Sequence, residues 1–255
     1  MIVIKVGGNE LDNESFLRGF AQAVAALPEA PVIVHGGGRG TTMLMERFGL
    51  EARFVEGLRV TDAQTLELAV MGMVGQASMR LVQALVNAGV PALGLSGVDA
   101  GLVTAEPVTV AGGDLGAVGQ PVAVASERLL ALLNAGFVPC LAPISRGRDG
   151  ALLNVNADAV AQAVAAALDA ERLLFLTNVA AVTIDGQTVR ILTPAEIDEA
   201  IQSGEISGGM IPKTRAAVAA LQAGVRHALI TDLAGLTAIS QGHEAGTIIS
   251  KEMTF

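Results

Sequence analysis

The stretch VIVHGGGRG, residues 32–40, decides how the chain is interpreted. It begins with a short apolar run that is typical of a buried strand. Four glycines follow within five positions, and a helical pattern starts at Thr41. Because backbone N–H groups next to glycine can approach an anion closely, and because a helix N-terminus attracts negative charge, this order of elements predicts a phosphate site.

A second junction between a strand and glycines lies at the N-terminus, in the sequence IVIKVGG of residues 2–8. It contains Lys5, and lysine is scarce in this chain. The 16 basic residues include only three lysines, Lys5, Lys213 and Lys251, and the first two stand beside glycine-rich junctions. A compact, mobile ammonium group suits a site where phosphate charge moves. We therefore interpret Lys5 and Lys213 as phosphate-binding candidates.

Strand-like runs alternate with helical patterns along the chain, which indicates a parallel sheet with helices on both faces. We expect an α/β fold, an open three-layer αβα sandwich with a largely parallel central sheet and β-hairpins inserted near 101–124 and 182–191. We expect one domain, 1–255, with approximate halves 1–150 and 151–255. Strands are predicted at 2–6, 32–35, 91–95, 138–142, 173–176, 228–231 and 247–249.

Composition excludes several classes of function. The chain is 51% hydrophobic and 16% charged, and its net charge of −9 argues against a nucleic-acid surface. We see no signal peptide and no uninterrupted run of 18 apolar residues, so we expect no membrane segment. A single cysteine, Cys140, rules out an intramolecular disulfide. We expect a cytoplasmic protein.

A long apolar helix is predicted from the cap Thr61-Asp62 to about Asn87, with Gly89 ending it. The glycines Gly72 and Gly75 are places where this helix could be broken. A helix this apolar lies either in the core or at a subunit interface. We expect a homodimer through residues 62–87.

Two familiar phosphate motifs do not fit. A Walker A loop needs glycine before its lysine, but Pro212 precedes Lys213, and the dinucleotide fingerprint lacks its third glycine after Gly38. What remains is the chemistry of phosphoryl transfer, which needs positioned cations and N–H donors. Lys5 and Lys213 could meet at the carboxyl edge of the sheet, where Asp158 could orient both. No local His, Cys and Asp cluster indicates a metal held by the protein.

Eight short motifs, in order, give the chain a resemblance to the amino acid kinase family over nearly its whole length. They are KVGG (5–8), VHGGG (34–38), GLRVT (57–61), LSG (95–97), DLGAVG (114–119), NVNAD (154–158), GMIPK (209–213) and GT (246–247). The resemblance implies ATP-dependent phosphorylation of the γ-carboxylate of N-acetyl-L-glutamate to an acyl phosphate, in arginine biosynthesis. It also implies that the N-terminal half binds the acylated amino acid and dimerises, and that the C-terminal half binds ATP. It further implies a Mg²⁺ ion held mainly by the nucleotide phosphates.

The resemblance also implies roles for individual residues. The catalytic set is Lys5, Lys213, Asp158, Gly8 and Gly37; the acceptor set is Gly36, Gly37, Arg59 and Asn154; the nucleotide set is Gly7, Gly8, Thr177, Asn178, Gly209, Met210 and Lys213. Arginine suits bidentate capture of the acceptor α-carboxylate, and lysine suits a migrating phosphoryl charge.

The sequence departs from the family pattern at Met79-Arg80, Val98 and Asn178, where the family has Asn-Lys, Lys and Asp. With Asn178 the chain resembles the relative that phosphorylates carrier-protein-bound aminoadipate or glutamate in lysine or arginine biosynthesis. That carrier-bound substrate is the alternative acceptor. A non-catalytic nucleotide-binding module on the same fold is an alternative of another class. Without an N-terminal helical extension, the chain resembles the shorter, dimeric, arginine-insensitive kind.

Overall fold

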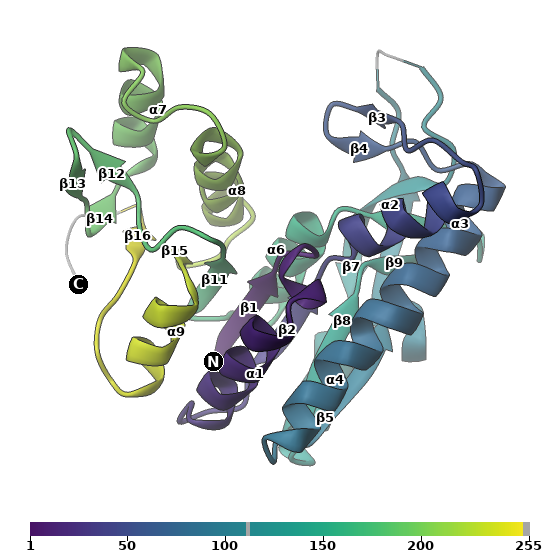
Figure 1. The fold of residues 1–255 in the computed structure, drawn as a ribbon, viewed down its shortest axis with the longest axis horizontal. Coiled ribbons are helices and arrows are strands. Elements are labelled where there is room, and N and C mark those ends of the chain that lie inside the picture. Colours follow the sequence, from purple (N-terminus) through teal and green to yellow (C-terminus); the bar gives the residue numbers. More distant parts are fainter. Residues whose placement is uncertain (111–112, 252–255) are drawn as a thin grey trace.

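The centre of the molecule is an eight-stranded sheet with strand order β14-β16-β15-β11-β1-β2-β8-β5 (Figure 1). The computed structural model describes residues 1–110 and 113–251. The strands are β1 (Ile2–Val6), β2 (Val32–His35), β5 (Ala92–Ser96), β8 (Val138–Ala142), β11 (Arg172–Leu176), β14 (Ile191–Leu192), β15 (His227–Thr231) and β16 (Thr247–Ile249). Neighbouring strands are parallel except at the β15–β16 pair. The largely parallel sheet expected from the sequence is confirmed.

Helices cover both faces of this sheet. Side chains alternate along a strand, so Val3 of β1 joins one hydrophobic cluster and Ile4 joins the other. The first face packs against α5 (Ser126–Asn134), α6 (Ala157–Ala167), α7 (Pro194–Ser203) and α8 (Met210–Gln222), and the second against α1 (Glu14–Ala25), α4 (Ser78–Asn87) and α9 (Leu233–Ser240). The same alternation aims the side chain of Lys5 at the α6 face.

The region predicted to hold inserted hairpins folds as a small closed barrel. Its strands are β6 (Val103–Pro107), β7 (Val118–Val124), β9 (Ile144–Gly147) and β10 (Leu152–Val155). The antiparallel β6–β7 pair lies where a hairpin was expected. The strands β9 and β10 were not predicted, and they place Asn154 in a buried strand rather than in a loop.

The predicted long helix is present as three continuous segments, α3 (Ala63–Val70), the π-helical η2 (Met71–Ala77) and α4. Asp62 caps it by accepting a hydrogen bond from the Thr65 N–H. The irregular segment contains both suspected glycines. A Cβ on Gly72 would lie 2.8 Å from the Thr41 hydroxyl, so this glycine lets the long helix pack closely on α2 (Gly38–Arg47).

By length and composition alone, residues 63–87 form one helix that could cross a membrane. One such helix is weak evidence, because core helices pass the same test. Here Leu81 and Leu85 are fully buried in the cluster beneath α1, while Arg80 and Gln83 face outward. The helix therefore packs as part of the layered fold.

Three local features differ from or refine the predictions. The helix α2 begins at Gly38, three residues before the predicted start, because packing on η2 outweighs the poor helix propensity of glycine. The helix α9 was not predicted. Residues 52–60 contain the hairpin of β3 (Phe54–Val55) and β4 (Leu58–Arg59). The hairpin expected near 182–191 is present as β12 (Thr183–Ile184) with β13 (Gln187–Thr188).

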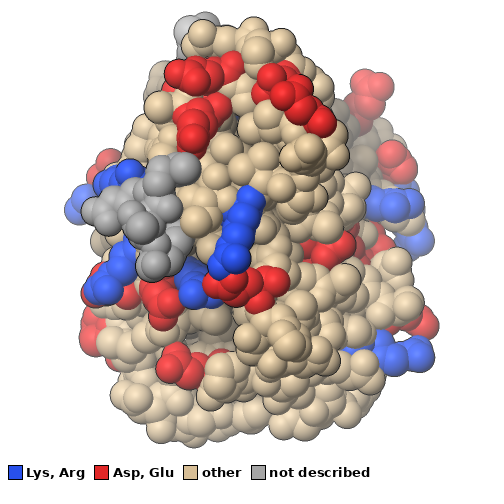
Figure 2. Space-filling model, turned by 90° about the vertical axis from the view of Figure 1, so that its left-hand side faces the viewer, with Lys and Arg blue, Asp and Glu red and all other residues tan. Residues whose placement is uncertain are grey.

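Among the described residues, the end of the molecule that carries α7 and α9 shows scattered rather than concentrated basic side chains. Figure 2 shows acidic side chains gathered at the top of this face, at the height of α7, and basic side chains scattered below them. The α7 segment and the turn after it contribute Glu196, Asp198, Glu199 and Glu205. This distribution agrees with the acidic net charge.

Candidate active site

The two residues that the sequence paired as a catalytic unit, Lys5 and Asp158, are in contact. Lys5 is on β1 and faces α6, and Asp158 lies in the first turn of that helix. Their Nζ and Oδ1 atoms are 2.8 Å apart, and both side chains are partly shielded from water. Asn156 caps α6 by accepting hydrogen bonds from the N–H groups of Asp158 and Ala159. The cap fixes the position of Asp158, and Asp158 in turn holds the Lys5 ammonium.

The two glycine junctions lie against each other beside this ion pair. The Gly36 N–H donates to the Val6 carbonyl, and a Cβ on Gly36 would lie 3.2 Å from the Gly8 nitrogen. A Cβ on Gly37 would lie 2.7 Å from Met73 Cγ, so this turn is also pressed against η2. The Gly36-Gly37 turn has no room for side chains, whereas a Cβ on Gly7 would make only an ordinary contact with Glu10. The two turns form a narrow backbone cradle at the carboxyl edge of β1 and β2, which is where ligands bind in such sheets.

Lys213 reaches the same edge from the first turn of α8 but has a different partner. Its Nζ donates a 2.8 Å hydrogen bond to Asn178 Oδ1, just beyond β11. The sequence suggested that Asp158 would orient both lysines; in the described structure the carboxylate contacts Lys5, and Asn178 takes this role for Lys213. Burial lowers the pKa of Lys213 and the nearby charge of Lys5 lowers it further, whereas Glu10 raises it. The two ammonium groups therefore act on each other across the cradle.

Glu10 is a site residue that the sequence did not indicate. It lies in the short helix η1 (Glu10–Asp12), and its carboxyl carbon would be 3.9 Å from a Cβ on Gly7. Its negative charge acts on Lys213, so it opposes the loss of that proton. Only its closeness to the N-terminal glycine junction could have marked it in the sequence.

A cavity of about 390 Å³ opens beside Lys213 and Asn178. Its walls come from the carboxyl ends of three neighbouring strands, through Asn9 and Glu10 after β1, Thr177 and Asn178 after β11, and Asp232 after β15. The turn after β11 is fixed because the Val179 N–H donates to the Thr177 hydroxyl. Two predicted nucleotide residues thus line this cavity. Of the other predicted nucleotide residues, Gly209 is the N-cap of α8 and Met210 is its first residue, one turn before Lys213.

Arg59 ends β4 of the β3–β4 hairpin and packs on α2, the helix that follows the Gly36–Gly38 turn. It is 7% exposed and donates to the Thr42 hydroxyl at 2.8 Å and to Met45 Sδ at 3.3 Å, both on α2. Its guanidinium also stacks 4.7 Å from the centre of the Phe54 ring. Burial lowers its pKa. These contacts fix the arginine fork between the hairpin and the helix that starts at the glycines.

Asn154 is joined to the Arg59 segment through Thr61. The Asn154 side-chain amide donates to the Thr61 hydroxyl at 3.1 Å, and that hydroxyl donates to the Arg59 carbonyl at 2.7 Å. The backbone closes this network, because the Ala117 N–H donates to the Thr61 carbonyl. The Asn154 amide, which belongs to the barrel, and the Thr61 hydroxyl are therefore held in fixed positions relative to the Arg59 backbone.

Within residues 1–110 and 113–251, no group of three or more His, Cys, Asp or Glu side chains could hold a metal ion. The arrangement instead offers two ammonium groups, a backbone cradle and a separate arginine. Such a set can stabilise a phosphoryl group in transfer on one side and grip a carboxylate on the other.

The chain is similar to known proteins over nearly its whole length. The model of the amino acid kinase family matches residues 1–232. The acetylglutamate kinase of Roseiflexus castenholzii is 51% identical over 251 residues, which cover 98% of this chain and 94% of that protein. The acetylglutamate kinase of Chloroflexus aurantiacus is 49% identical and covers 96% of this chain and 94% of its own length.

A solved structure has the same fold as this chain. The N-acetylglutamate synthase of Neisseria gonorrhoeae, complexed with coenzyme A and N-acetyl-glutamate, superposes with a TM-score of 0.82 at 26% identity. The match covers 99% of this chain and 60% of that one.

Proposed function

The chain belongs to the amino acid kinase family, and from this premise we propose that it phosphorylates the γ-carboxylate of N-acetyl-L-glutamate with ATP. The product is an acyl phosphate, and the step belongs to arginine biosynthesis. The observation that carries this function is the sequence identity of 51% and 49% with two acetylglutamate kinases, over 98% and 96% of this chain. The site supports it, because Lys5, Lys213 and the glycine cradle share one edge of the sheet.

The reaction is an in-line displacement at phosphorus. An oxygen of the acceptor carboxylate forms a bond to the γ-phosphorus, the bond from that phosphorus to the β,γ-bridging oxygen breaks, and ADP leaves with the electron pair. No proton has to be removed from a carboxylate, so the protein needs no general base. Its task is to position the reactants and balance the charge.

The nucleotide side of the site follows from the lysines. Lys213 and Lys5 stabilise the negative charge of the phosphoryl group from two directions, and Asp158 keeps Lys5 in place. Gly7, Gly8 and Gly37 supply backbone N–H donors at the cradle. Thr177, Asn178, Gly209 and Met210 form the nucleotide wall. Family membership implies ATP and commonly Mg²⁺; since the described side chains offer no carboxylate cluster, the ion is held mainly by the nucleotide phosphates and neutralises part of their charge.

The acceptor side is built from Arg59, Asn154 and the Gly36-Gly37 turn. Arg59 binds the α-carboxylate bidentately and Asn154 binds the acylamino group. The acceptor γ-carboxylate then lies against the two glycines, within reach of the transferred group. In this division the half 1–150 holds most of the acceptor site and the half 151–255 most of the ATP site, within one domain, while Asn154 and the Gly7-Gly8 turn each serve the other side.

We also propose a homodimer formed through residues 62–87, in the cytoplasm. Exposed apolar side chains along this helix support the interface, since Met71, Met79 and Val86 are 53%, 67% and 52% exposed. The buried single cysteine suits a reducing compartment. Sedimentation at micromolar concentration tests the dimer, and a monomer there would reject this interface.

The test of the reaction is a hydroxamate assay across acceptors. Hydroxylamine traps acyl phosphates, so N-acetyl-L-glutamate with ATP should give hydroxamate, whereas N-acetyl-L-aspartate should give much less. The alternative acceptor, carrier-protein-bound aminoadipate or glutamate, is favoured by Asn178 and is tested in parallel. Turnover with the carrier-linked substrate alone would reassign the acceptor. ATP binding without turnover of any acceptor would favour a non-catalytic module.

A further inference from the structure

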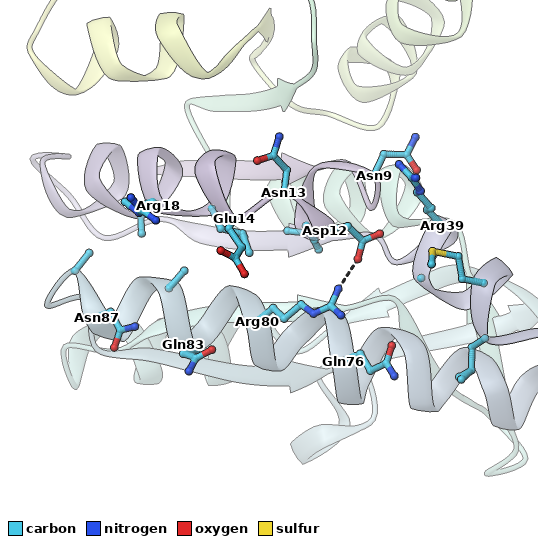
Figure 3. Close-up of a pocket in the computed structure, with 18 of the residues that line it drawn as sticks. Asn9, Asp12, Asn13, Glu14, Arg18, Arg39, Gln76, Arg80, Gln83 and Asn87 are labelled. Carbon is cyan, nitrogen blue, oxygen red and sulfur yellow. Dashed lines mark hydrogen bonds and ion pairs between the residues drawn. The ribbon is translucent and has the colours of Figure 1, made fainter. Parts of the chain in front are cut away.

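A second cavity, larger than the one beside Lys213, lies next to the site discussed above. It is a groove of about 1050 Å³ between α1 and the row α2, η2 and α4 (Figure 3). Its floor is apolar, with Leu11, Leu17 and Ala84, and amides such as Gln76 and Gln83 line its walls. Lys5 faces α6, whereas this groove lies on the α1 and α4 face of the sheet. The groove adjoins the nucleotide cavity, with which it shares Asn9 and Asn13, but its lining includes none of Lys5, Lys213 and Arg59.

The charges lining the groove have the opposite sign to the chain as a whole. Four arginines, Arg18, Arg39, Arg47 and Arg80, line it against two carboxylates, Asp12 and Glu14, in a chain of net charge −9. Such a concentration of one charge in a hollow raises the local concentration of counter-ions. The groove should therefore attract anions, although the protein as a whole carries a negative charge.

Three of these arginines are available to a ligand. In the part of the chain that the structure describes, Arg18, Arg39 and Arg47 form no ion pair, whereas Arg128, Arg148, Arg172, Arg190 and Arg226 all do. They come from two different walls, Arg18 from α1 and the other two from α2. A guanidinium fork binds carboxylate or phosphate through two parallel hydrogen bonds. The arginines therefore offer separate binding points for anionic groups along the groove.

The fourth arginine shows how such a group is bound. Arg80 on α4 forms an ion pair with Asp12 at the end of η1, drawn as the dashed line in Figure 3. The pair crosses the groove, so the Asp12 carboxylate already occupies an arginine fork in the way that a ligand anion would. It also competes with any ligand for Arg80.

We propose that this groove is a binding site for an organic anion that carries two or more carboxylate or phosphate groups on a partly apolar body. The arginines hold the anionic groups, the amides fix their orientation, and the leucine and alanine floor covers the carbon skeleton. The walls connect to the active site, because Asn9 follows Gly8 directly and Arg39 follows the Gly36–Gly38 turn. An anion held by Arg39 and Arg80 joins α2, which starts at the Gly36–Gly38 turn, to α4.

Isothermal titration with citrate and with pyrophosphate tests the proposal and separates carboxylate from phosphate ligands. We expect the wild-type chain to bind at least one probe, and the double variant Arg18→Gln/Arg47→Gln to weaken its binding by about tenfold or more, because it loses two charge-assisted contacts. The exposed Arg146, on β9 and outside the groove, gives the control Arg146→Gln, which should stay within about twofold of wild type. Thermal melting of each variant confirms folding.

Two further variants test the proposal: one should leave citrate binding unchanged and the other should strengthen probe binding. Lys213→Ala should keep citrate binding, because it removes a cation from the active site and not from the groove, whereas any loss of pyrophosphate binding reports the glycine cradle. Asp12→Asn should tighten probe binding several-fold, because it releases Arg80. The proposal is wrong if the wild-type chain binds neither probe at millimolar concentration. It is equally wrong if citrate binding is lost in Lys213→Ala and kept in Arg18→Gln/Arg47→Gln, since the probe then occupies the active site.

Discussion

The Lys5 ammonium lies 2.8 Å from the Asp158 carboxylate, and this contact joins the carboxyl end of β1 to the first turn of α6. It holds one of the two site lysines at the glycine cradle. We predict that Asp158→Asn lowers kcat by about 10- to 100-fold, because an ammonium group that is free to move is poorly placed for the transferring phosphoryl group.

The measurement is the kcat and KM of the hydroxamate reaction. Asp198→Asn, at an exposed position on α7, is the matched control and should behave like wild type. Because Asp158 is partly exposed, its loss should change the melting temperature little. A variant with unchanged kcat would show that Lys5 needs no partner.

Gly72 supports the acceptor side through packing. A Cβ there would lie 2.8 Å from Thr41 Oγ1 and 3.2 Å from Thr41 Cα, so α2 would have to move away from η2. We predict that Gly72→Ala destabilises the protein by about 1–3 kcal/mol. It should also raise the KM for N-acetyl-L-glutamate, because Thr42 on α2 contacts Arg59.

Gly40→Ala provides the comparison for this variant, since a Cβ on Gly40, also in α2, meets no atom within 4 Å. It should leave stability unchanged or raise it by up to about 1 kcal/mol. Urea unfolding measures both. Equal stabilities of the two variants would contradict the close packing of α2 on η2.

The buried His35 makes stability depend on pH. Its Nδ1–H donates to the Gly36 carbonyl at 3.0 Å, and burial lowers its pKa from 6.5 to about 4. The His35 imidazole therefore binds a proton below pH 6.5 in the unfolded chain, but only below about pH 4 in the folded chain. Protonation favours the unfolded chain, so stability should fall as pH drops through this range, by about 3 kcal/mol at the lower end.

Denaturant unfolding between pH 7 and pH 4 measures this slope, and His35→Leu should reduce it by about that amount. His243→Gln, at an exposed position, controls for the loss of a histidine as such. A slope that is the same in wild type and His35→Leu would assign the acid sensitivity to other groups.

Much of the fold follows from local sequence patterns. The alternation of strands and helices is encoded in short apolar runs, caps and stops, as with the Thr193–Glu196 capping box that begins α7. The barrel is not encoded in this way, because β9 and β10 are short and gain their stability from pairing with β6 and β7. The helix α9 has a cap at Asp232 but glycine at its third residue, which hides its start.

The site was predictable to a similar degree. Lys5, Asp158 and the glycines are marked by local junctions, and the structure brings them together. The pairing of Lys213 with Asn178 spans 35 residues and depends on how α8 meets the end of β11. Glu10 and the arginine groove depend on three-dimensional arrangement in the same way, since the groove arginines come from α1, α2 and α4.

The central claim is that Lys5 and Lys213 together stabilise the phosphoryl group during its transfer to N-acetyl-L-glutamate. The most direct test is the kcat of Lys213→Ala in the hydroxamate assay, with the exposed Lys251→Ala as the control. The account predicts a loss of about 100- to 1000-fold for Lys213→Ala and a change within about twofold for Lys251→Ala. A Lys213→Ala protein that is folded and retains wild-type kcat would contradict the account.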